Sequence, residues 1–360
     1  MSESNSQRQA DVKLTAIETL VKPLLGDSAI VQRRAIAKAI TLLESTRADH
    51  RAQADELLTV LLPRTGQALR LGISGVPGVG KSTFIEALGL YLITKGHRVA
   101  VLAVDPSSSL SGGSILGDKT RMERLSASER AYIRPSPSGG ALGGVAEKTR
   151  EAMLVCEAAG YDVVIVETVG VGQSETAVAN MTDMFVLLQL PNAGDDLQAI
   201  KRGVMELADL VVINKADLDA AAATRARAQI ISALHLFSRE DHPGHGQTGD
   251  AAAQQSQWQP EVLQLSALTA SGIDIFWAAV QKFKTLQTAS GKLVQRRERQ
   301  ALAWMWERIE SGLKQSFQQN ARVQALLPRL SQRVAQGELP ASVAARTLLA
   351  ASVGAATDIS

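Results

Sequence analysis

Gly75-Val76-Pro77-Gly78-Val79-Gly80-Lys81-Ser82 has the spacing of a phosphate-binding loop, G-x-x-x-x-G-K-S. It follows an apolar run and precedes a helix-like segment that begins at Thr83, which we include in the binding loop. The glycines let successive backbone N–H groups turn toward one anion, and the amino end of the helix adds partial positive charge. We predict that the loop cradles the phosphates of a nucleotide. Lys81 is expected to face solvent when the loop is empty and to reach the β- and γ-phosphates when it is filled, and Ser82 to ligate Mg²⁺.

A second motif, Asn214-Lys215-Ala216-Asp217, follows a later apolar run. The carboxylate of Asp217 can accept hydrogen bonds from both N1–H and the 2-amino group of guanine, a donor pair that adenine lacks. Asn214 is expected to brace the loop and Lys215 to lie over the ring. A polar turn after a strand is the alternative for so short a motif. Ser266-Ala267-Leu268 makes that alternative less favourable, because a backbone N–H there would meet the guanine O6.

Two acids stand where apolar runs end. Asp105 follows Val101–Val104, and Glu167 follows Val163–Val166. Each can hold Mg²⁺, directly or through water, and the backbone N–H of Gly170 is then placed to sense a γ-phosphate. The alternative for each acid is a helix or turn cap.

Composition narrows the class of protein. The 360 residues include 38 basic and 36 acidic side chains, so the net charge is +2 and there is no basic stripe of the kind that binds nucleic acid. We interpret the densest basic cluster, Arg296-Arg297-Glu298-Arg299, as a solvated helix face. The single cysteine, Cys156, excludes an intramolecular disulfide and a CxxC metal site, and its helical surroundings favour an inert core thiol. With neither a membrane-length apolar run nor a signal-peptide pattern, we expect no membrane partner and a cytoplasmic protein.

Three regions follow from the periodicity. Residues 1–62 have helical spacing and predict an N-terminal extension. Residues 63–288 predict an α/β domain, a mostly parallel sheet flanked by helices, because short apolar runs alternate with helical segments. The expected strands are Leu69–Ser74, Arg98–Val104, Ala131–Arg134, Asp162–Glu167, Met184–Leu190, Leu210–Asn214 and Val262–Ser266. Parallel sheets bind ligands at the carboxyl ends of their strands, where both nucleotide motifs stand.

Residues 289–360 predict a helical arm with a stripe of large apolar side chains. The stripe consists of Leu302, Met305, Trp306, Ile309, Leu313 and Phe317. It can pack on its own domain or on a second subunit. Before the arm, Ser238–Pro260 reads as a loop, whose two histidines lack a third metal ligand.

Four longer segments resemble the MeaB/ArgK family, within the SIMIBI class of P-loop proteins, in their amino-acid sequences and in their order along the chain. They are Asp105–Ser108, Gly112–Met122, Glu167–Glu175 and Asp195–Gly203, and the resemblance runs from about Ile36 to Arg299. It implies Mg²⁺-dependent GTP hydrolysis and a homodimer joined through C-terminal helices. It also implies a client, an adenosylcobalamin-dependent acyl-CoA mutase, chiefly methylmalonyl-CoA mutase, whose cobalamin the family loads or protects.

By the same resemblance, Gly112–Met122 corresponds to switch I, Glu167–Glu175 to switch II and Asp195–Lys201 to a further switch loop. No Gln directly follows Gly170, where Ras-like enzymes keep the side chain that positions water. The partner of the catalytic water therefore stays open, and its candidates are Gln173, Gln198 and Lys201. The candidate catalytic residues are Lys81, Glu167, Gln198 and Lys201.

Two other functions compete with a mutase-directed GTPase. A nickel-insertion GTPase shares the sequence around Glu167, but it needs thiols or clustered histidines near the phosphate loop. Cys156 is the single cysteine of this chain, which disfavours that function. An amino-acid-transport kinase or ATPase is the other. Asp217 argues against adenine, and Val76 occupies the position where dimerising ATPases of the class carry a second lysine.

Overall fold

The computed structural model describes residues 17–104, 122–134, 142–168, 174–191, 202–240 and 258–353. The chain forms two compact units, which divide after Arg297. The first unit holds the sheet and also the N-terminal helices. The second begins at Glu298, and its described part consists of helices joined by short turns.

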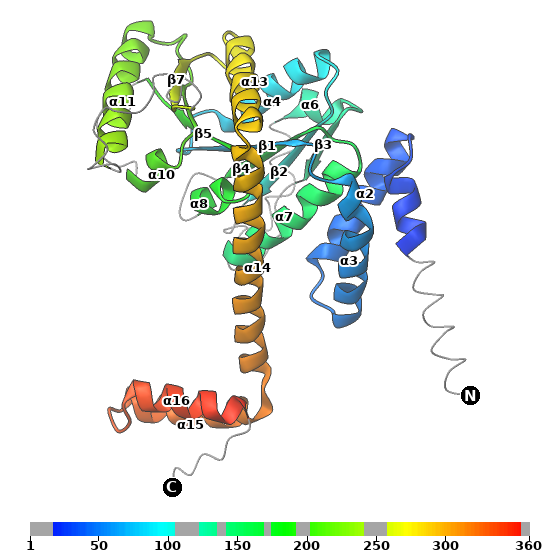
Figure 1. Ribbon diagram of the computed structural model, residues 1–360, viewed down its shortest axis with the longest axis vertical. Coiled ribbons are helices and arrows are strands. Elements are labelled where there is room, and N and C mark those ends of the chain that lie inside the picture. Colours follow the sequence, from blue (N-terminus) through cyan, green and yellow to red (C-terminus); the bar gives the residue numbers. More distant parts are fainter. Residues whose placement is uncertain are drawn as a thin grey trace. The chain divides into compact units, whose positions relative to one another are not determined.

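Within the described residues, seven strands form one sheet in the order β3-β2-β4-β1-β5-β6-β7 (Figure 1). Every neighbouring pair is parallel. The strands are β1 (Leu69–Gly75), β2 (Val99–Val104), β3 (Ala131–Arg134), β4 (Val163–Thr168), β5 (Met184–Gln189), β6 (Leu210–Ile213) and β7 (Glu261–Gln264). The predicted α/β class is confirmed, and each predicted run overlaps one strand, although β1, β4 and β7 each extend one residue beyond the predicted bounds.

The central strands are buried on both faces, which explains their nearly continuous apolar sequences. In β4 and β5 every residue is buried. Parallel pairing brings the carboxyl ends of β1, β4 and β5 to one edge of the sheet. In that register Glu167 lies opposite Ile73, two residues before β1 ends at Gly75. The edge of the sheet that carries the phosphate loop therefore also carries the acid of β4.

Helices cover both faces of the sheet (Figure 1). One face packs against α4 (Lys81–Thr94), α6 (Glu123–Ala127) and α13 (Ile273–Ala289). The rings of Phe84 in α4 and Phe276 in α13 meet edge to face at 5.0 Å between centroids. The other face packs against α7 (Leu142–Ala158), α8 (Ser174–Ala179), α10 (Arg202–Glu206) and α11 (Ala220–Glu240).

The N-terminal residues are helical, as their spacing predicts. α2 (Ala29–Glu44) and α3 (Ala48–Leu61), followed by the 3₁₀ turn η1 (Leu62–Arg64), pack beside α7. Gln32 fixes α2 in place: its buried side-chain amide donates to the carbonyls of Leu24, at 2.9 Å, and Ala159, at 3.0 Å. This long-range pairing makes the extension part of the first compact unit.

The second unit contains most of α14 (Lys292–Gln319), together with α15 (Ala321–Ala335) and α16 (Ala341–Ser352). The hairpin of α15 and α16 has a small core of five buried side chains: Val323, Leu330, Leu339, Ala344 and Leu348. Asn320 caps α15 by accepting from the backbone N–H of Arg322 at 2.9 Å, and its amide donates to the carbonyl of Ser352 at 3.1 Å. In α14, by contrast, no residue is buried.

Two expectations about single residues have different outcomes. Cys156 is buried in the core, as predicted, and burial raises the pKa of its thiol, which keeps the thiol protonated. The solvated face expected for Arg296 and Arg297 is wrong. Both guanidinium groups are partly buried and paired, with Asp209 and Asp183 respectively. These acids precede β6 and β5, so the pairing was hidden in the sequence. None of the helices in the described ranges combines the length and apolar character that a bilayer crossing requires.

Candidate functional site

The phosphate loop connects β1 to α4 with a backbone that requires glycine. Gly80 has a φ of +94°, and a Cβ added there would lie 2.8 Å from the side-chain nitrogen of Asn214. At Gly75 an added Cβ would lie 2.6 Å from the carbonyl oxygen of Leu188. No side chain caps α4, whose first residue is Lys81. The first N–H groups of this helix are therefore available for an anion such as a phosphate.

The sequence led us to expect that Lys81 faces solvent, and this expectation is wrong. Only 8% of the residue is exposed. Its ammonium group donates to the carbonyl oxygens of Gly75, at 2.7 Å, and Val76, at 3.3 Å. A buried ammonium group needs acceptors, and the carbonyls of its own loop supply them. Lys81 is thus part of the internal bonding of the loop.

Ser82 and Glu167 come together from α4 and β4. The hydroxyl of Ser82 donates to a carboxylate oxygen of Glu167 at 3.3 Å, and Glu167 is 9% exposed. A hydroxyl and a carboxylate are oxygen ligands of the kind that Mg²⁺ prefers, so these two residues fit the predicted metal site. The predicted third ligand, Asp105, directly follows β2, which pairs with β4, but Asp105 itself lies outside the described residues.

The base motif is bonded directly to the phosphate loop. Asn214 is 1% exposed; its amide donates to the carbonyl of Val79 at 2.8 Å, and its oxygen accepts from the backbone N–H of Ala267 at 3.0 Å. Lys215 donates from its ammonium group to the carbonyl of Gly78 at 2.9 Å. Its backbone is left-handed, with a φ of 59°, which is uncommon outside glycine. Asn214 therefore ties together the phosphate loop, the base motif and the loop that follows β7.

The other residues predicted to bind the base lie in the turns that follow β6 and β7. Ser266 and Ala267 are buried, and Leu268 is 80% exposed. Asp217 is exposed. The reason is its place in a turn beyond the end of β6, where no element of the described chain covers it. In the phosphate loop, Pro77 and Gly78 are exposed and Val79 is buried, while Thr83 is an exposed residue of α4.

Several predicted site residues cannot be placed. Gly170, Gln173, Gln198 and Lys201 lie outside the described residues, as does Gly112–Arg121. Residues 169–173 follow β4, and residues 192–201 come shortly after β5. Both strands end at the edge of the sheet that carries the phosphate loop.

The sequence reasoning missed one polar contact beside the site. Thr168, the last residue of β4, donates from its hydroxyl to that of Ser74 in β1 at 3.0 Å. Both side chains are buried. The available signal was a small hydroxyl residue near the end of two otherwise apolar strands. The contact joins the strand of Glu167 to the strand that enters the phosphate loop.

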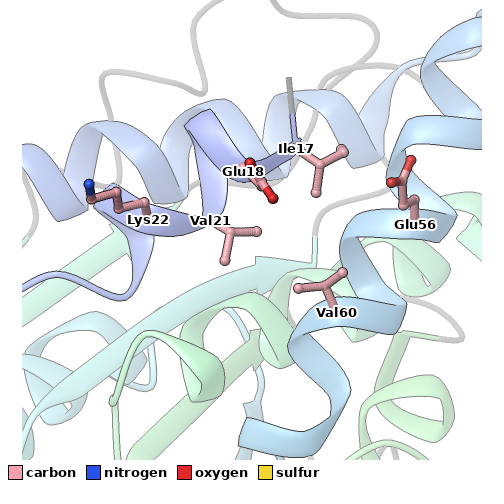
Figure 2. Close-up of a pocket in the computed structure, with 6 residues that line it drawn as sticks. All are labelled: Ile17, Glu18, Val21, Lys22, Glu56 and Val60. Carbon is pink, nitrogen blue, oxygen red and sulfur yellow. The ribbon is translucent and has the colours of Figure 1, made fainter. Parts of the chain in front are cut away.

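A hollow elsewhere on the first unit is separate from these motifs. A pocket of about 400 Å³ lies between residues 17–22 and α3, and Figure 2 shows the side chains around it. They are Ile17, Glu18, Val21, Lys22, Glu56 and Val60. None of them belongs to a nucleotide motif, so the chemistry of the candidate site does not involve this pocket.

The chain is similar to known proteins over most of its length. The model of a family described as methylmalonyl-CoA mutase-associated GTPase MeaB matches residues 36–322. A protein of Caulobacter vibrioides that is named as a GTPase is 55% identical over 319 residues, which are 89% of this chain and 94% of the relative. GTPase ArgK of Escherichia coli is 52% identical over 280 residues, 78% of this chain and 80% of the relative. A crystal structure of an LAO/AO transport system kinase superposes with a TM-score of 0.69 at 40% identity, covering 93% of this chain and 97% of that one.

We predict that Asn214→Ala weakens nucleotide binding more than it weakens the fold. The substitution leaves the buried carbonyl of Val79 and the N–H of Ala267 without their partner, which costs about 1–3 kcal/mol. Because both groups hold the loops of the site, we expect calorimetry to record a loss of about 10–100-fold in affinity for GTP. Asp219→Ala, which removes a cap from α11 at Ala222, is the matched control. Equal affinity loss in the two variants would contradict the bracing role.

We also predict that Asp217→Asn changes the preferred base. A carboxylate accepts two hydrogen bonds from guanine, whereas an amide presents an acceptor oxygen beside an NH2 donor group, a pair that suits the N1–H and the O2 acceptor of xanthine. The unmutated protein is expected to prefer GTP over ATP and XTP by at least about 100-fold, and the variant to prefer XTP. Competition binding with the three nucleotides measures both ratios. Equal affinity of the unmutated protein for GTP and ATP would refute the assignment of the base motif.

Proposed function

Because the chain belongs to the family of methylmalonyl-CoA mutase-associated GTPases, we propose that it couples GTP hydrolysis to the handling of adenosylcobalamin by an acyl-CoA mutase. The protein is a GTPase that binds guanine nucleotides and belongs to a mutase-associated family. We propose in addition that an acyl-CoA mutase is its client, that the client's cofactor is adenosylcobalamin, that Mg²⁺ is its metal, and that it is a cytoplasmic homodimer.

The observation that carries the proposal is the bonding between the two nucleotide motifs. Asn214 and Lys215 donate to the carbonyls of Val79 and Gly78, so direct hydrogen bonds join the base motif to the phosphate loop. A ligand that contacts both motifs must have a base and phosphates at a fixed separation. A guanine nucleotide meets that condition.

The described side chains support a division of labour in hydrolysis. We propose that Ser82 and Glu167, with Asp105, hold Mg²⁺, which when bound offsets charge on the phosphate oxygens. Lys81 has to exchange the carbonyls of Gly75 and Val76 for phosphate oxygens, because its ammonium group cannot serve both sets fully. The open amino end of α4 supplies further N–H donors. Candidates for orienting the attacking water remain Gln173, Gln198 and Lys201.

Coupling to a client requires that the nucleotide interact differently with two conformations of the protein. The segments proposed to differ are Glu167–Glu175 and Asp195–Lys201, which lie at or beyond the carboxyl ends of β4 and β5. Both strands end at the edge of the sheet that carries the phosphate loop. A client that binds this edge can favour one conformation and so change the rate of hydrolysis.

We predict that a purified adenosylcobalamin-dependent acyl-CoA mutase from the source cell increases the GTP turnover of this protein at least several-fold. The measurement is phosphate release at saturating GTP, with and without the mutase. Lys81→Ala is the inactive control, because it removes charge where the transition state gains it. A mutase that neither changes turnover nor binds in a nucleotide-dependent way would refute the proposed client.

Lys201→Ala separates two roles within the same assay. If Lys201 relays the nucleotide state, the variant loses most of the stimulation while its unstimulated turnover changes by less than about 1 kcal/mol in activation free energy. Equal proportional loss of both rates would make Lys201 catalytic instead.

The homodimer is proposed from the exposed stripe on α14. Leu302, Met305, Trp306, Ile309 and Leu313 recur at the spacing of one helix face. Their exposure is high for such residues, 59% for Trp306 and 66% for Leu313. A contiguous stripe of this kind marks a protein interface. A second copy is the fitting occupant, because one helix face can pair with itself about a two-fold axis and α15–α16 has only a small core of its own.

We predict that Trp306→Glu converts the dimer to a monomer. The substitution places a charge in the centre of the proposed apolar interface, where it would be desolvated without a partner. Sedimentation velocity at micromolar concentration measures the mass. Ser311→Glu is the matched control, because residue 311 lies on the opposite face of α14 and receives the same charge. If the variant and the control have the same mass, the stripe does not form the dimer.

A further inference from the structure

The amino edge of the sheet, opposite the nucleotide motifs, carries two acids that bridge neighbouring strands. Asp183 precedes β5, and its carboxylate accepts from the backbone N–H of Arg70 in β1 at 2.9 Å. Asp209 precedes β6, and its carboxylate accepts from the N–H of Phe185 in β5 at 2.8 Å. The side chain of Asp183 is fully buried. A carboxylate in such surroundings requires a positively charged side chain nearby, and the side chains of β5 and β6 include none.

Arg297 of α14 supplies the cation for Asp183. Its guanidinium binds both carboxylate oxygens, with Nε 2.7 Å from Oδ1 and Nη2 2.6 Å from Oδ2. The remaining donors reach the carbonyls of Ala68, at 2.7 Å, and Gly66, just before β1. This bidentate geometry is the strong form of an arginine–carboxylate pair. One side chain thus connects α14 to the beginnings of β1 and β5.

Arg296 makes an equivalent connection to the next strand. Its guanidinium donates to the two carboxylate oxygens of Asp209 at 3.1 and 2.9 Å, and to the backbone carbonyl of Asp183 at 2.6 Å. Consecutive residues on a helix point about 100° apart, so two neighbouring arginines can reach two different acids. Together, Arg296 and Arg297 bind the first turns of α14 to the beginnings of β1, β5 and β6.

A third pair completes the charge balance. Arg70 in β1 donates to Glu157 in α7 at 2.5 Å, and the other carboxylate oxygen of Glu157 accepts from the N–H of Gly66, also at 2.5 Å. Three arginines and three acids are thereby paired in a largely desolvated cluster. Removing one partner alone would leave a buried charge unmatched, whereas neutralising both partners of a pair can leave stability nearly unchanged.

We propose that Arg296 and Arg297 form a latch that holds the first turns of α14 against the amino ends of β1, β5 and β6, and that mutase-dependent GTP turnover depends on this latch. β1 and β6 begin in this cluster and lead into the phosphate loop and the base motif respectively, and β5 begins there and ends at Gln189, at the edge of the sheet that carries both motifs. α14 is continuous from Lys292 to Gln319, so its root and the stripe belong to one helix. The latch therefore connects α14 to three strands whose carboxyl ends lie at the edge of the sheet that carries the nucleotide motifs. The functional half of this inference rests on the proposed dimer and client.

Asp183→Asn and Arg297→Met, singly and together, separate latching from stability. The asparagine retains an acceptor for the N–H of Arg70, and the double variant contains no unmatched charge in the pair. Lys292→Met is the matched control, because Lys292 is an exposed cation at the start of the same helix. Hydrogen–deuterium exchange of residues 292–300 reports the latch, and exchange of β4 reports the integrity of the sheet.

We expect exchange at residues 292–300 to rise at least tenfold in Arg297→Met and in the double variant, and to stay unchanged in Lys292→Met. Exchange in β4 is expected to stay slow in the double variant. Slow exchange at residues 292–300 in the double variant would overturn the latch. This readout requires neither a client nor a dimer, so it stands apart from the proposed function.

The coupling half has its own measurement. In the double variant, unstimulated GTP turnover is expected to stay within about twofold of the unmutated protein, because the cluster and the nucleotide site lie at opposite edges of the sheet. The part of turnover that depends on the mutase is expected to fall at least fivefold. If the mutase still stimulates turnover fully in a variant whose residues 292–300 exchange fast, the latch does not contribute to mutase-dependent turnover.

Discussion

Parallel pairing of strands that are buried on both faces is the constraint on which the rest of this structure depends. A parallel sheet brings every carboxyl end to one edge and every amino end to the other. Because β1 lies between β4 and β5, the loop after Gly75 is flanked by the ends of both neighbours. Residues as far apart in sequence as Val79 and Asn214, which are separated by 135 positions, then meet in a direct hydrogen bond.

The two edges of the sheet use charge in opposite ways. At the carboxyl edge, the amino end of α4 has no side-chain cap, and Asp217 is exposed. These groups are available to a ligand. At the amino edge, the acids and arginines around Asp183 satisfy one another, and backbone groups take the remaining hydrogen bonds. The first edge is suited to reversible binding, and the second to holding an additional helix in place.

The nucleotide site is organised largely by bonds among its own loops. Lys81 and Lys215 both donate to carbonyls of the phosphate loop, and Asn214 bonds to it and to the loop of Ala267. This bonding reduces the conformational freedom that a ligand would otherwise have to restrict. The proposed role of Lys81 therefore requires its ammonium group to exchange these carbonyls for phosphate oxygens. Binding energy from the remainder of the nucleotide has to offset that exchange.

Sequence by itself determined the class of the fold, the strands and the two nucleotide motifs. These features depend on local rules: apolar runs predict buried strands, and the spacing of Gly75–Ser82 predicts a loop of N–H donors. Only the tertiary structure decided that Lys81 is buried, that Ser82 meets Glu167 and that Arg297 pairs with Asp183. Arg297 and Asp183 are 114 residues apart, and the same basic cluster on an exposed helix would be solvated. Whether a charge is paired depends on what the fold brings beside it, and spacing along the chain carries no information about that.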